Sequence, residues 1–308
     1  MTVLVTGGAG FIGSHLVRRL LAEHESVRVL DDFSTGRREN LADCDAVLVE
    51  RDIVADDLRD AVRDVTTIFH LAAIPSVPRS VRDPLRSHGA SATGTLRLLE
   101  AARQASVATF ITSSSSSVYG DIAAPPMRES MPTLPRSPYA VAKLAAEGYT
   151  RVFAALYGMR TVNLRYFNVF GPRQDPASAY AAAIPKFVTA YVERRAPVVY
   201  DDGQQSRDFT FVANVVEANV RASKAQHLSG QSVNVAGGAP RSVLDLLRAI
   251  AAVFGYWIEP EFQPARPGDI RDSHADIALA RSLIGYEPVV SFDEGLRQTI
   301  DWLRSVGS

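Results

Sequence analysis

Residues 3–13 read Val3-Leu4-Val5-Thr6-Gly7-Gly8-Ala9-Gly10-Phe11-Ile12-Gly13. The run joins an apolar strand to a glycine-rich turn and then to the first turn of a helix. From Gly8 onward it fits the pattern G-x-G-x-x-G, in the strand-turn-helix context that gives this pattern its meaning. Glycines allow a tight turn and a close backbone approach, which leaves the helix N-terminus to receive a pyrophosphate. The run therefore predicts a dinucleotide site.

An acidic residue supports this prediction. Asp31 lies eighteen residues after Gly13, at the end of the second predicted strand. A carboxylate at that place can accept the adenosine ribose hydroxyls and repel a 2′-phosphate. NAD is therefore favoured over NADP, although Arg37 and Arg38 lie nearby and keep NADP as the alternative.

The first half of the chain alternates short strands with helices. Periodic apolar patterns predict helices over 11–21, 84–104 and 139–157. Such alternation is typical of βαβ units, so the predicted fold class is α/β, with a doubly wound parallel sheet covered on both faces. Runs rich in β-branched residues predict its strands at 2–6, 27–31, 47–49, 67–72, 108–113 and 161–166.

The distribution of prolines and glycines changes after about residue 167. Prolines and glycines then break the chain into short pieces, from Gly171-Pro172 to Pro288. We therefore expect a nucleotide-binding domain over 1–167, to which some later segments return. A smaller C-terminal α/β lobe over 168–308 is expected to bind mainly the substrate.

Composition excludes several classes of protein. The 308 residues are 46% hydrophobic and 22% charged, which is typical of a globular domain, and the net charge of −1 argues against nucleic acid or an anionic membrane as a partner. The sequence has no apolar run of the roughly 18 to 20 residues that span a bilayer. Its first residues read straight into a strand rather than into a leader, so a cytoplasmic location is expected.

Cysteine and histidine usage gives no sign of a metal. Cys44 is the single cysteine and is interpreted as structural, because it can form no internal disulfide. The six histidines are scattered without metal-ligand spacing, so no metal site is predicted.

Lys143 is one of only three lysines in a chain with thirty arginines, and it follows Tyr139 by four residues. Residues four apart share one face of a helix, so the ammonium can sit beside the phenol. An adjacent cation lowers the pKa of a phenol from its usual value of about 10. The alternative is an exposed helix pair without chemistry.

Five consecutive serines occupy positions 113–117. A serine run normally indicates a flexible segment. Here it directly follows an apolar strand, which places it at the carboxyl end of that strand, where ligands bind in parallel α/β sheets.

Together these features resemble the extended short-chain dehydrogenase/reductase family, and within it the NAD-dependent UDP-sugar 4-epimerases. The resemblance covers nearly the whole chain. It implies a Rossmann-type fold with NAD as cofactor and a UDP-sugar as substrate. Its motifs are, in order, 5–15, 31–36, 52–53, 70–73, 114–120, 139–143 and 165–173.

The resemblance also implies cofactor contacts. The adenine is expected on Asp52 and Ile53, and the nicotinamide ribose on Lys143. The full expected set is Gly7, Gly10, Phe11, Ile12, Gly13, Asp31, Asp32, Phe33, Ser34, Thr35, Gly36, Asp52, Ile53, His70, Leu71, Ala72, Ala73, Ile74, Ser113, Tyr139, Lys143 and Phe167.

By the same resemblance, the reaction is a 4-epimerisation through a transient 4-keto sugar. Tyr139, with its pKa lowered by Lys143 and by the positive nicotinamide, would take the proton of the sugar O4 hydroxyl as hydride leaves C4 for NAD. The family's catalytic serine or threonine falls on Ser115, with Ser116 as its substitute because the register within the serine run is open by one residue.

The implied UDP-sugar site draws mostly on the second lobe. Asn168, Arg207, Arg266 and Asp269 match the family's nucleotide site, where an arginine fork suits a diphosphate. Ser273 stands where more restrictive relatives have tyrosine, so N-acetyl sugars could fit. Equally, a C6 carboxylate could meet Arg79 or the 181–187 segment with Ile184 and Lys186. Ser115, Ser116 and Tyr139 complete the expected substrate contacts.

One departure from the family stands out. Ser91 occupies the place of its usual asparagine, so the local role of that position is open; a water could replace the missing amide.

Other reactions remain as alternatives. Family 4,6-dehydratases and UDP-glucuronate decarboxylases carry carboxylates just before the Val-Tyr-Gly, where this chain has Ser116 and Ser117. Elimination thus lacks its acid and base, and decarboxylation is disfavoured less strongly. A non-catalytic NAD sensor is the alternative outside enzymes. UDP-glucose and UDP-glucuronate are the expected substrates, with UDP-GlcNAc behind them, and a homodimer through the helices near 84–104 and 139–157 is the expected assembly.

Overall fold

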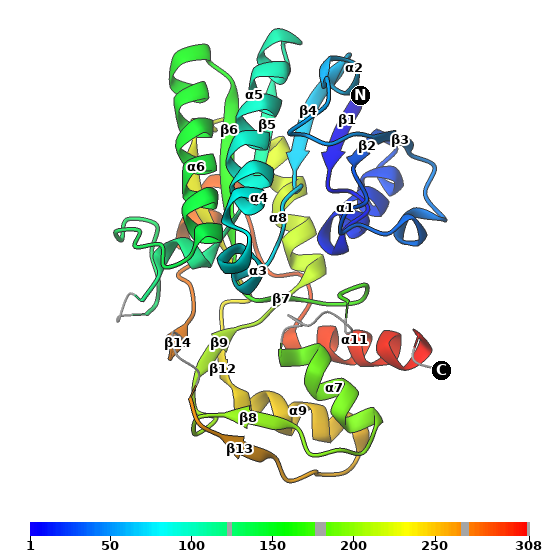
Figure 1. The fold of residues 1–308 in the computed structure, drawn as a ribbon, viewed down its shortest axis with the longest axis vertical. Coiled ribbons are helices and arrows are strands. Elements are labelled where there is room, and N and C mark those ends of the chain that lie inside the picture. Colours follow the sequence, from blue (N-terminus) through cyan, green and yellow to red (C-terminus); the bar gives the residue numbers. More distant parts are fainter. Residues whose placement is uncertain (122–124, 176–182, 266–270, 307–308) are drawn as a thin grey trace.

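The computed structural model describes residues 1–121, 125–175, 183–265 and 271–306. Its centre is a parallel sheet of seven strands in the order β11-β6-β5-β4-β1-β2-β3 (Figure 1). This doubly wound order confirms the predicted fold class. The strands are β1 Thr2–Thr6, β2 Ser26–Asp31, β3 Val47–Glu50, β4 Val65–His70, β5 Thr109–Ser115, β6 Arg160–Tyr166 and β11 Gln231–Val235.

Helices cover both faces of the sheet. Along β1 the side chains alternate, so that Val3 and Val5 pack in one core with Leu16 of α1, and Leu4 packs in the other with Phe110. The first face carries α1 Phe11–Ala22, α8 Val212–Lys224 and α10 Ala278–Ile284. The second carries α2 Arg59–Val62, α3 Val77–Arg82, α4 Pro84–His88, α5 Gly94–Gln104 and α6 Pro138–Tyr157.

The segment predicted as a helix over 84–104 is helical throughout, with one wider turn inside it. It consists of α4, one wider turn over Gly89–Thr93, and α5. Gly94 begins α5 against the side chain of Ile53, where an added Cβ would lie 2.5 Å from Cδ1. The Thr95 hydroxyl donates to the Ser91 carbonyl, which satisfies one of the carbonyls that the wider turn frees.

The smaller lobe lies below the sheet in Figure 1. Its own core joins Phe187 and Tyr191 to Leu247 and Ile300, beneath Phe170. It contains the strand pairs β7 Val169–Phe170 with β10 Thr210–Phe211 and β8 Val198–Tyr200 with β13 Glu261–Gln263, the sheet of β9 Ser206–Asp208, β12 Pro240–Ser242 and β14 Asp272–Ser273, and the helices α7 Ala183–Val192, α9 Val243–Phe254 and α11 Phe292–Val306.

The chain crosses between the two parts more than once. After β6 it enters the smaller lobe, and α8 and β11 then bring it back to the large sheet, where β11 pairs with β6 from Gln231 to Val235. Helices α8 and α10 and strand β11 thus pack with the large sheet although they follow β7 in the chain. The domain boundary at residue 167 stays a prediction.

The thiol of Cys44 is half-buried against the sheet core, and its burial raises its pKa. Within the described ranges, no helix combines the length and the hydropathy needed to cross a bilayer. Nor do three or more His, Cys, Asp or Glu side chains of those ranges gather as metal ligands.

Candidate active site

The glycine turn after β1 is closed by its own backbone. Gly7 has a φ of +69°, its N–H donates to the Leu30 carbonyl at 2.8 Å, and its carbonyl accepts from Gly10 N–H at 3.1 Å. A Cβ on Gly13 would lie 2.1 Å from that same Gly7 carbonyl oxygen. Helix α1 therefore packs directly on the turn, and side chains at these positions would push it away.

A cavity of about 910 Å³ runs from the N-terminus of α1 past Asp31 to Lys143. Most of the expected cofactor residues line it: Gly7, Gly10, Phe11, Ile12, Gly13, Asp31, Asp32, Ser34, Thr35, Gly36, Asp52, Ile53, Leu71, Ala72, Ala73, Ile74, Ser113, Tyr139 and Lys143. Three do not. Phe33, His70 and Phe167 lie outside the lining, and Phe167 is fully buried beside the ring of Tyr119.

The Asp31 carboxylate is held by two backbone amides. Oδ2 accepts from Ala9 N–H and Oδ1 from Phe33 N–H, each at 2.9 Å. Burial raises the pKa of Asp31, and these two hydrogen bonds oppose the rise because they favour the anion. The carboxylate is thereby fixed at the cavity wall, where ribose hydroxyls can reach it.

The two arginines that kept NADP as an alternative have other partners. Arg37 forms an ion pair with Asp175 at 3.0 Å. Arg38 forms an ion pair with Glu50 and lies over the ring of Phe33, 4.0 Å from its centroid. Phe33 thus supports Arg38 outside the cavity, and both guanidinium groups are already engaged by carboxylates.

His70 lies behind the cavity and positions its wall. Its Nε2 bonds to Thr95 Oγ1 at 2.9 Å and its Nδ1 to Thr6 Oγ1 at 2.7 Å. Because Thr95 donates to the Ser91 carbonyl, it must accept from Nε2–H, so Nδ1 accepts from Thr6. Burial lowers the pKa of His70 to about 3, which keeps this tautomer neutral.

The result is a directional chain of hydrogen bonds. Thr6 also accepts from Ala72 N–H at 3.3 Å, so His70 fixes the loop that follows β4. At the other end of the chain, the Ser91 hydroxyl is buried and has no hydrogen-bond partner within the described residues. The substitution of the family's asparagine therefore leaves an unmatched polar group beside this network.

Lys143 is held by the strand end rather than by the phenol. Its Nζ donates to Ser113 carbonyl oxygen at 2.7 Å and to Ser113 Oγ at 3.2 Å. Burial lowers the pKa of Lys143 to about 8, and the charge of Glu147 opposes this decrease.

Two opposing effects act on the pKa of Tyr139. Burial raises it, and a hydrogen bond from Ser115 lowers it in part. Desolvation of the phenol dominates here, and the ammonium is directed to Ser113. The lowering of the Tyr139 pKa by Lys143 together with the positive nicotinamide stays a prediction for the NAD-bound protein.

The serine run is resolved residue by residue. Ser113 holds Lys143, Ser114 donates to Glu147 Oε1 at 2.6 Å, and Ser115 bonds to Tyr139. Ser117 donates to Ser115 Oγ at 2.9 Å, while Ser116 begins the short helix over Ser116–Tyr119 and is half-buried. Of the two candidates, Ser115 is the one that lies against the tyrosine.

A buried ion pair that sequence reasoning missed lies behind these residues. Glu147 stands one helical turn after Lys143 and is paired with Arg165 on β6; both side chains are almost completely buried. Glu147 also accepts from Ser232 of β11 at 2.8 Å. The spacing of four from Lys143, on a face already assigned to the interior, is the signal that could have found Glu147.

The expected substrate residues of the second lobe are only partly brought together. Arg207 on β9 pairs in register with Ser273 on β14, and Ser273 is buried. Asn168 donates to the Asp208 carbonyl at 3.2 Å, beside Arg207 in the chain. Ile184 packs in the core of the smaller lobe and Lys186 is exposed on α7. Arg266 and Asp269 lie outside the described residues.

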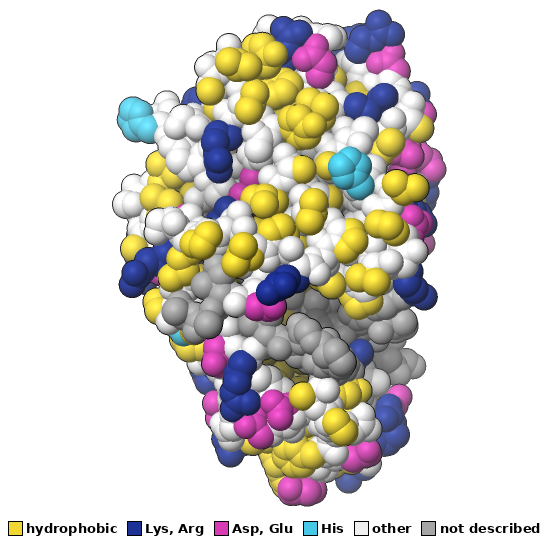
Figure 2. All heavy atoms as spheres, turned by 60° about the vertical axis from the view of Figure 1, so that its left-hand side comes forward, with side chains coloured by type: hydrophobic (Ala, Val, Ile, Leu, Met, Phe, Trp, Pro, Cys, Tyr) yellow, Lys and Arg dark blue, Asp and Glu magenta, His cyan; other side chains and the backbone are white. Residues whose placement is uncertain are grey.

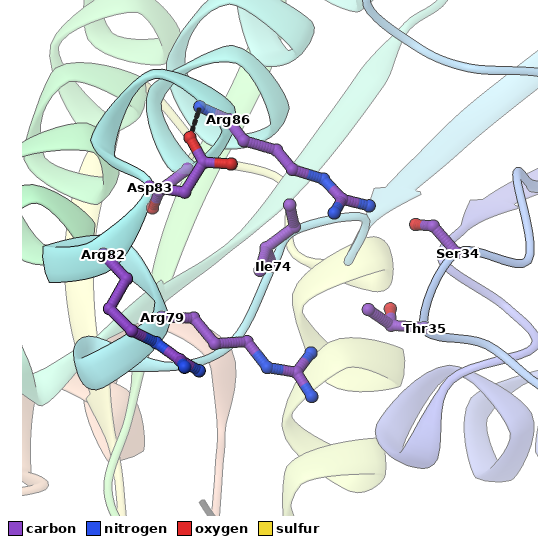
Figure 3. Close-up of a pocket in the computed structure, with 8 residues that line it drawn as sticks. Ser34, Thr35, Ile74, Arg79, Arg82, Asp83 and Arg86 are labelled. Carbon is purple, nitrogen blue, oxygen red and sulfur yellow. Dashed lines mark hydrogen bonds between the residues drawn. The ribbon is translucent and has the colours of Figure 1, made fainter.

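Arg79 lies on the cofactor side. It lines the large cavity and also a neighbouring one of about 350 Å³, formed with Ser34, Thr35, Ile74, Arg82, Asp83, Arg86 and Ser87. Figure 3 shows Arg79 and Arg86 extending from α3 and α4 toward the side of the cavity that carries Thr35 and Ser34. Sequence reasoning missed Arg82 and Arg86, which read as ordinary surface charges.

Comparisons with known proteins agree with this geometry. The model of the family described as GDP-mannose 4,6 dehydratase matches residues 4–299. The chain is 43% identical over 312 residues to a UDP-glucose 4-epimerase of Mycolicibacterium smegmatis, and the match covers 99% of each protein. Two solved structures are also similar to this chain.

The first is a UDP-N-acetylglucosamine 4-epimerase of Methanobrevibacter ruminantium in complex with UDP-N-acetylmuramic acid. Its TM-score is 0.95 at 40% identity, with 99% of this chain and 98% of that one covered. The second is a UDP-glucuronic acid 4-epimerase of Bacillus cereus in complex with UDP-glucuronic acid and NAD. Its TM-score is 0.92 at 32% identity, with 99% and 100% covered.

Proposed function

The chain belongs to the GDP-mannose 4,6 dehydratase family of extended short-chain dehydrogenases/reductases, and we propose that it is an NAD-dependent 4-epimerase of a UDP-hexose. The observation that carries this proposal is the placement of Ser115, Tyr139 and Lys143 at one end of a cavity whose other end is a glycine turn with a fixed carboxylate.

The residues present fit NAD. Gly7, Gly10 and Gly13 line the cavity without side chains, so a diphosphate can approach the backbone at the N-terminus of α1. Asp31 offers a carboxylate to the adenosine ribose, and Lys143 lines the far end of the cavity, where the nicotinamide ribose would be held. The chemistry that NAD supplies when bound is the reversible acceptance of a hydride.

The side chains of the site then perform the proton transfer. Tyr139 removes the proton of the sugar O4 hydroxyl and later returns it, while Ser115 holds O4 beside the phenol. The hydrogen bond from Ser115 favours the tyrosine anion, against the burial of the ring. A 4-keto sugar that turns over before it is reduced again gives the C4 epimer, with no net oxidation.

The residues before Val118 favour epimerisation over elimination or decarboxylation. Ser116 and Ser117 occupy the places where those reactions use carboxylates, and the hydroxyl of Ser117 is already bonded to Ser115. A serine hydroxyl is far too weak an acid or base for the proton transfers at C5 and C6.

For the substrate we propose UDP-glucose or UDP-glucuronate, with UDP-GlcNAc as the next candidate. Arg207 is proposed to meet the diphosphate, with Asn168 beside it. Ser273, small and buried next to Arg207, leaves space around the sugar.

We further propose that the protein is a homodimer that pairs through the segment 84–104 and helix α6. Five apolar side chains of this helix are exposed, namely Val141, Tyr149, Val152, Leu156 and Tyr157. Figure 2 shows apolar groups gathered on the upper part of the face that α6 presents. An exposed apolar helix face of this kind is typical of a protein–protein interface. Light scattering, which measures the oligomeric state of the Leu156→Glu variant and of the parent chain, tests the proposed dimer.

The deciding experiment offers UDP-glucose, UDP-glucuronate and UDP-GlcNAc with NAD and resolves the products by C4 configuration. We expect conversion of at least one of them, and the ratios of kcat/KM identify the substrate. Failure to form a C4 epimer from any of the three contradicts the proposal.

A further inference from the structure

Three arginines converge on one cavity at the corner between α3 and α4. Ser76 caps α3 by accepting from Arg79 N–H at 3.1 Å, and Asp83 caps α4 by accepting from Arg86 N–H at 3.0 Å. These caps fix the angle between the two short helices. As a result Arg79, Arg82 and Arg86 all line the cavity of about 350 Å³.

The opposite wall of this cavity is tied to the glycine turn. Ser34 and Thr35 belong to the loop after β2, and that loop is anchored where Arg37 N–H and Asn40 Nδ2 donate to the Ala9 carbonyl at 3.0 and 2.8 Å. The small and large cavities share walls, because Ser34, Thr35, Ile74, Arg79 and Arg86 line both. The arginines therefore face the region next to the N-terminus of α1.

The carboxylates of this region are engaged locally. Asp83 accepts at the cap of α4, Asp31 accepts from two backbone amides, and Asp32 accepts from the backbone and hydroxyl of Ser34 at 2.9 and 2.7 Å. Figure 3 shows the guanidinium ends of Arg79 and Arg86 reaching across the cavity, away from Asp83. The lining of the cavity thus brings three guanidinium groups to one place.

We propose that Arg79 and Arg86, supported by Arg82, form an outer phosphate subsite that closes on the diphosphate of the bound dinucleotide from the side opposite α1. The helix N-terminus and the arginine forks would hold the diphosphate from two directions. This inference rests on the proposed function for the identity of the ligand. It moves Arg79 from the sugar carboxylate to the cofactor, since Arg79 shares its cavities with Ser34 and Thr35 and not with Asn168, Arg207 or Ser273.

The test measures cofactor release from the holoenzyme. Arg79→Gln and Arg86→Gln are loaded with radiolabelled NAD and chased with excess unlabelled NAD. The control is Arg248→Gln, which removes an exposed arginine from α9. We expect each cavity variant to release NAD about tenfold faster, in line with the loss of a charge-assisted hydrogen bond. Added salt should accelerate the release of NAD from the parent more steeply than from the double variant Arg79→Gln/Arg86→Gln.

The binding of further ligands distinguishes contact with the diphosphate from contact with a 2′-phosphate or with the sugar nucleotide. Binding of ADP-ribose should weaken in both variants, while binding of adenosine, which lacks the diphosphate, should not change. An effect confined to NADP would assign the arginines to a 2′-phosphate and overturn the proposal. Unchanged NAD release would also overturn the proposal, as would a raised KM for the sugar nucleotide with NAD release unaltered. Because release is measured without turnover, the result does not depend on whether the protein epimerises any sugar.

Discussion

Glu147 and Arg165 form a two-point ion pair inside the protein, with Arg165 Nε 2.8 Å from Oε1 and Nη2 2.7 Å from Oε2. Two serines complete the coordination of the carboxylate, Ser114 on β5 and Ser232 on β11. Since Ser114 stands between the serine that holds Lys143 and the serine that bonds to Tyr139, the ion pair fixes the strand end that carries both contacts.

Loss of the Glu147 charge should be costly. We expect Glu147→Gln to lower the free energy of unfolding by about 3–5 kcal/mol, because Arg165 would remain buried without its counter-charge. Urea denaturation measures this. The double variant Glu147→Gln/Arg165→Met should recover part of the loss; a single variant within 1 kcal/mol of the parent would show that the pair is dispensable.

Removal of the phenol should separate chemistry from cofactor binding. Tyr139→Phe is expected to lose turnover by a factor of about 10²–10⁴, which is the usual contribution of a positioned acid-base group. NAD retention should persist, because the ring remains in place. The matched variant Lys143→Met should lose both, since Lys143 lines the cavity and holds the strand end. Absence of turnover in both the parent and Tyr139→Phe, with equal NAD binding, would favour the NAD sensor.

Because the Lys143 ammonium is buried, we expect the free energy of unfolding to depend on pH. The pKa of Lys143 is lowered to about 8 in the folded protein and returns to its usual value, about 10.4, on unfolding. Between these values the unfolded state binds more protons, so stability should rise with pH across this window, by at most about 1.4 kcal/mol per pH unit. Urea denaturation at pH 8, 9 and 10 should show this component in the parent and not in Lys143→Met; identical slopes would disprove it.

The packing of α1 on its turn predicts a sharp penalty for a single methyl group. In Gly13→Ala the new Cβ would lie 2.1 Å from the Gly7 carbonyl oxygen, a backbone atom that cannot rotate away. We expect destabilisation by about 1–3 kcal/mol and loss of NAD binding, measured by thermal unfolding and calorimetry. The control Gly148→Ala meets no atom within 4 Å on α6 and should be neutral or slightly stabilising. Tight NAD binding by Gly13→Ala would refute the expectation.

The parts of the fold that follow from local pattern were predictable from the sequence. The strand at 2–6, the turn and the helix after it are set by alternation and by glycine spacing, and the structure has β1 at those residues. The strand before the serines was predicted to end at 113, whereas β5 continues to Ser115. Pairing of Ser115 with Tyr166 on the neighbouring strand extends β5, and no local signal within five identical residues could show this.

The remaining features depend on contacts between distant segments. The wider turn within the helix over 84–104 ends where Gly94 packs on Ile53, and burial raises the pKa of Tyr139. Arg165 and Glu147 are eighteen residues apart, and neither residue type is expected in a core without the other. Such features become visible once the strands are placed next to the helices.

The return of the chain as β11 makes the two parts of the molecule mutually dependent. A fragment that ends at residue 167 would leave β6 as an open edge of the sheet and would take Ser232 away from Glu147. The seventh strand can therefore pair only after the part of the smaller lobe from β7 to β10 has been synthesised. Ser114 at the end of β5 and Ser232 on β11 bond to the same Glu147 carboxylate, so pairing of the seventh strand completes the support of the serine run.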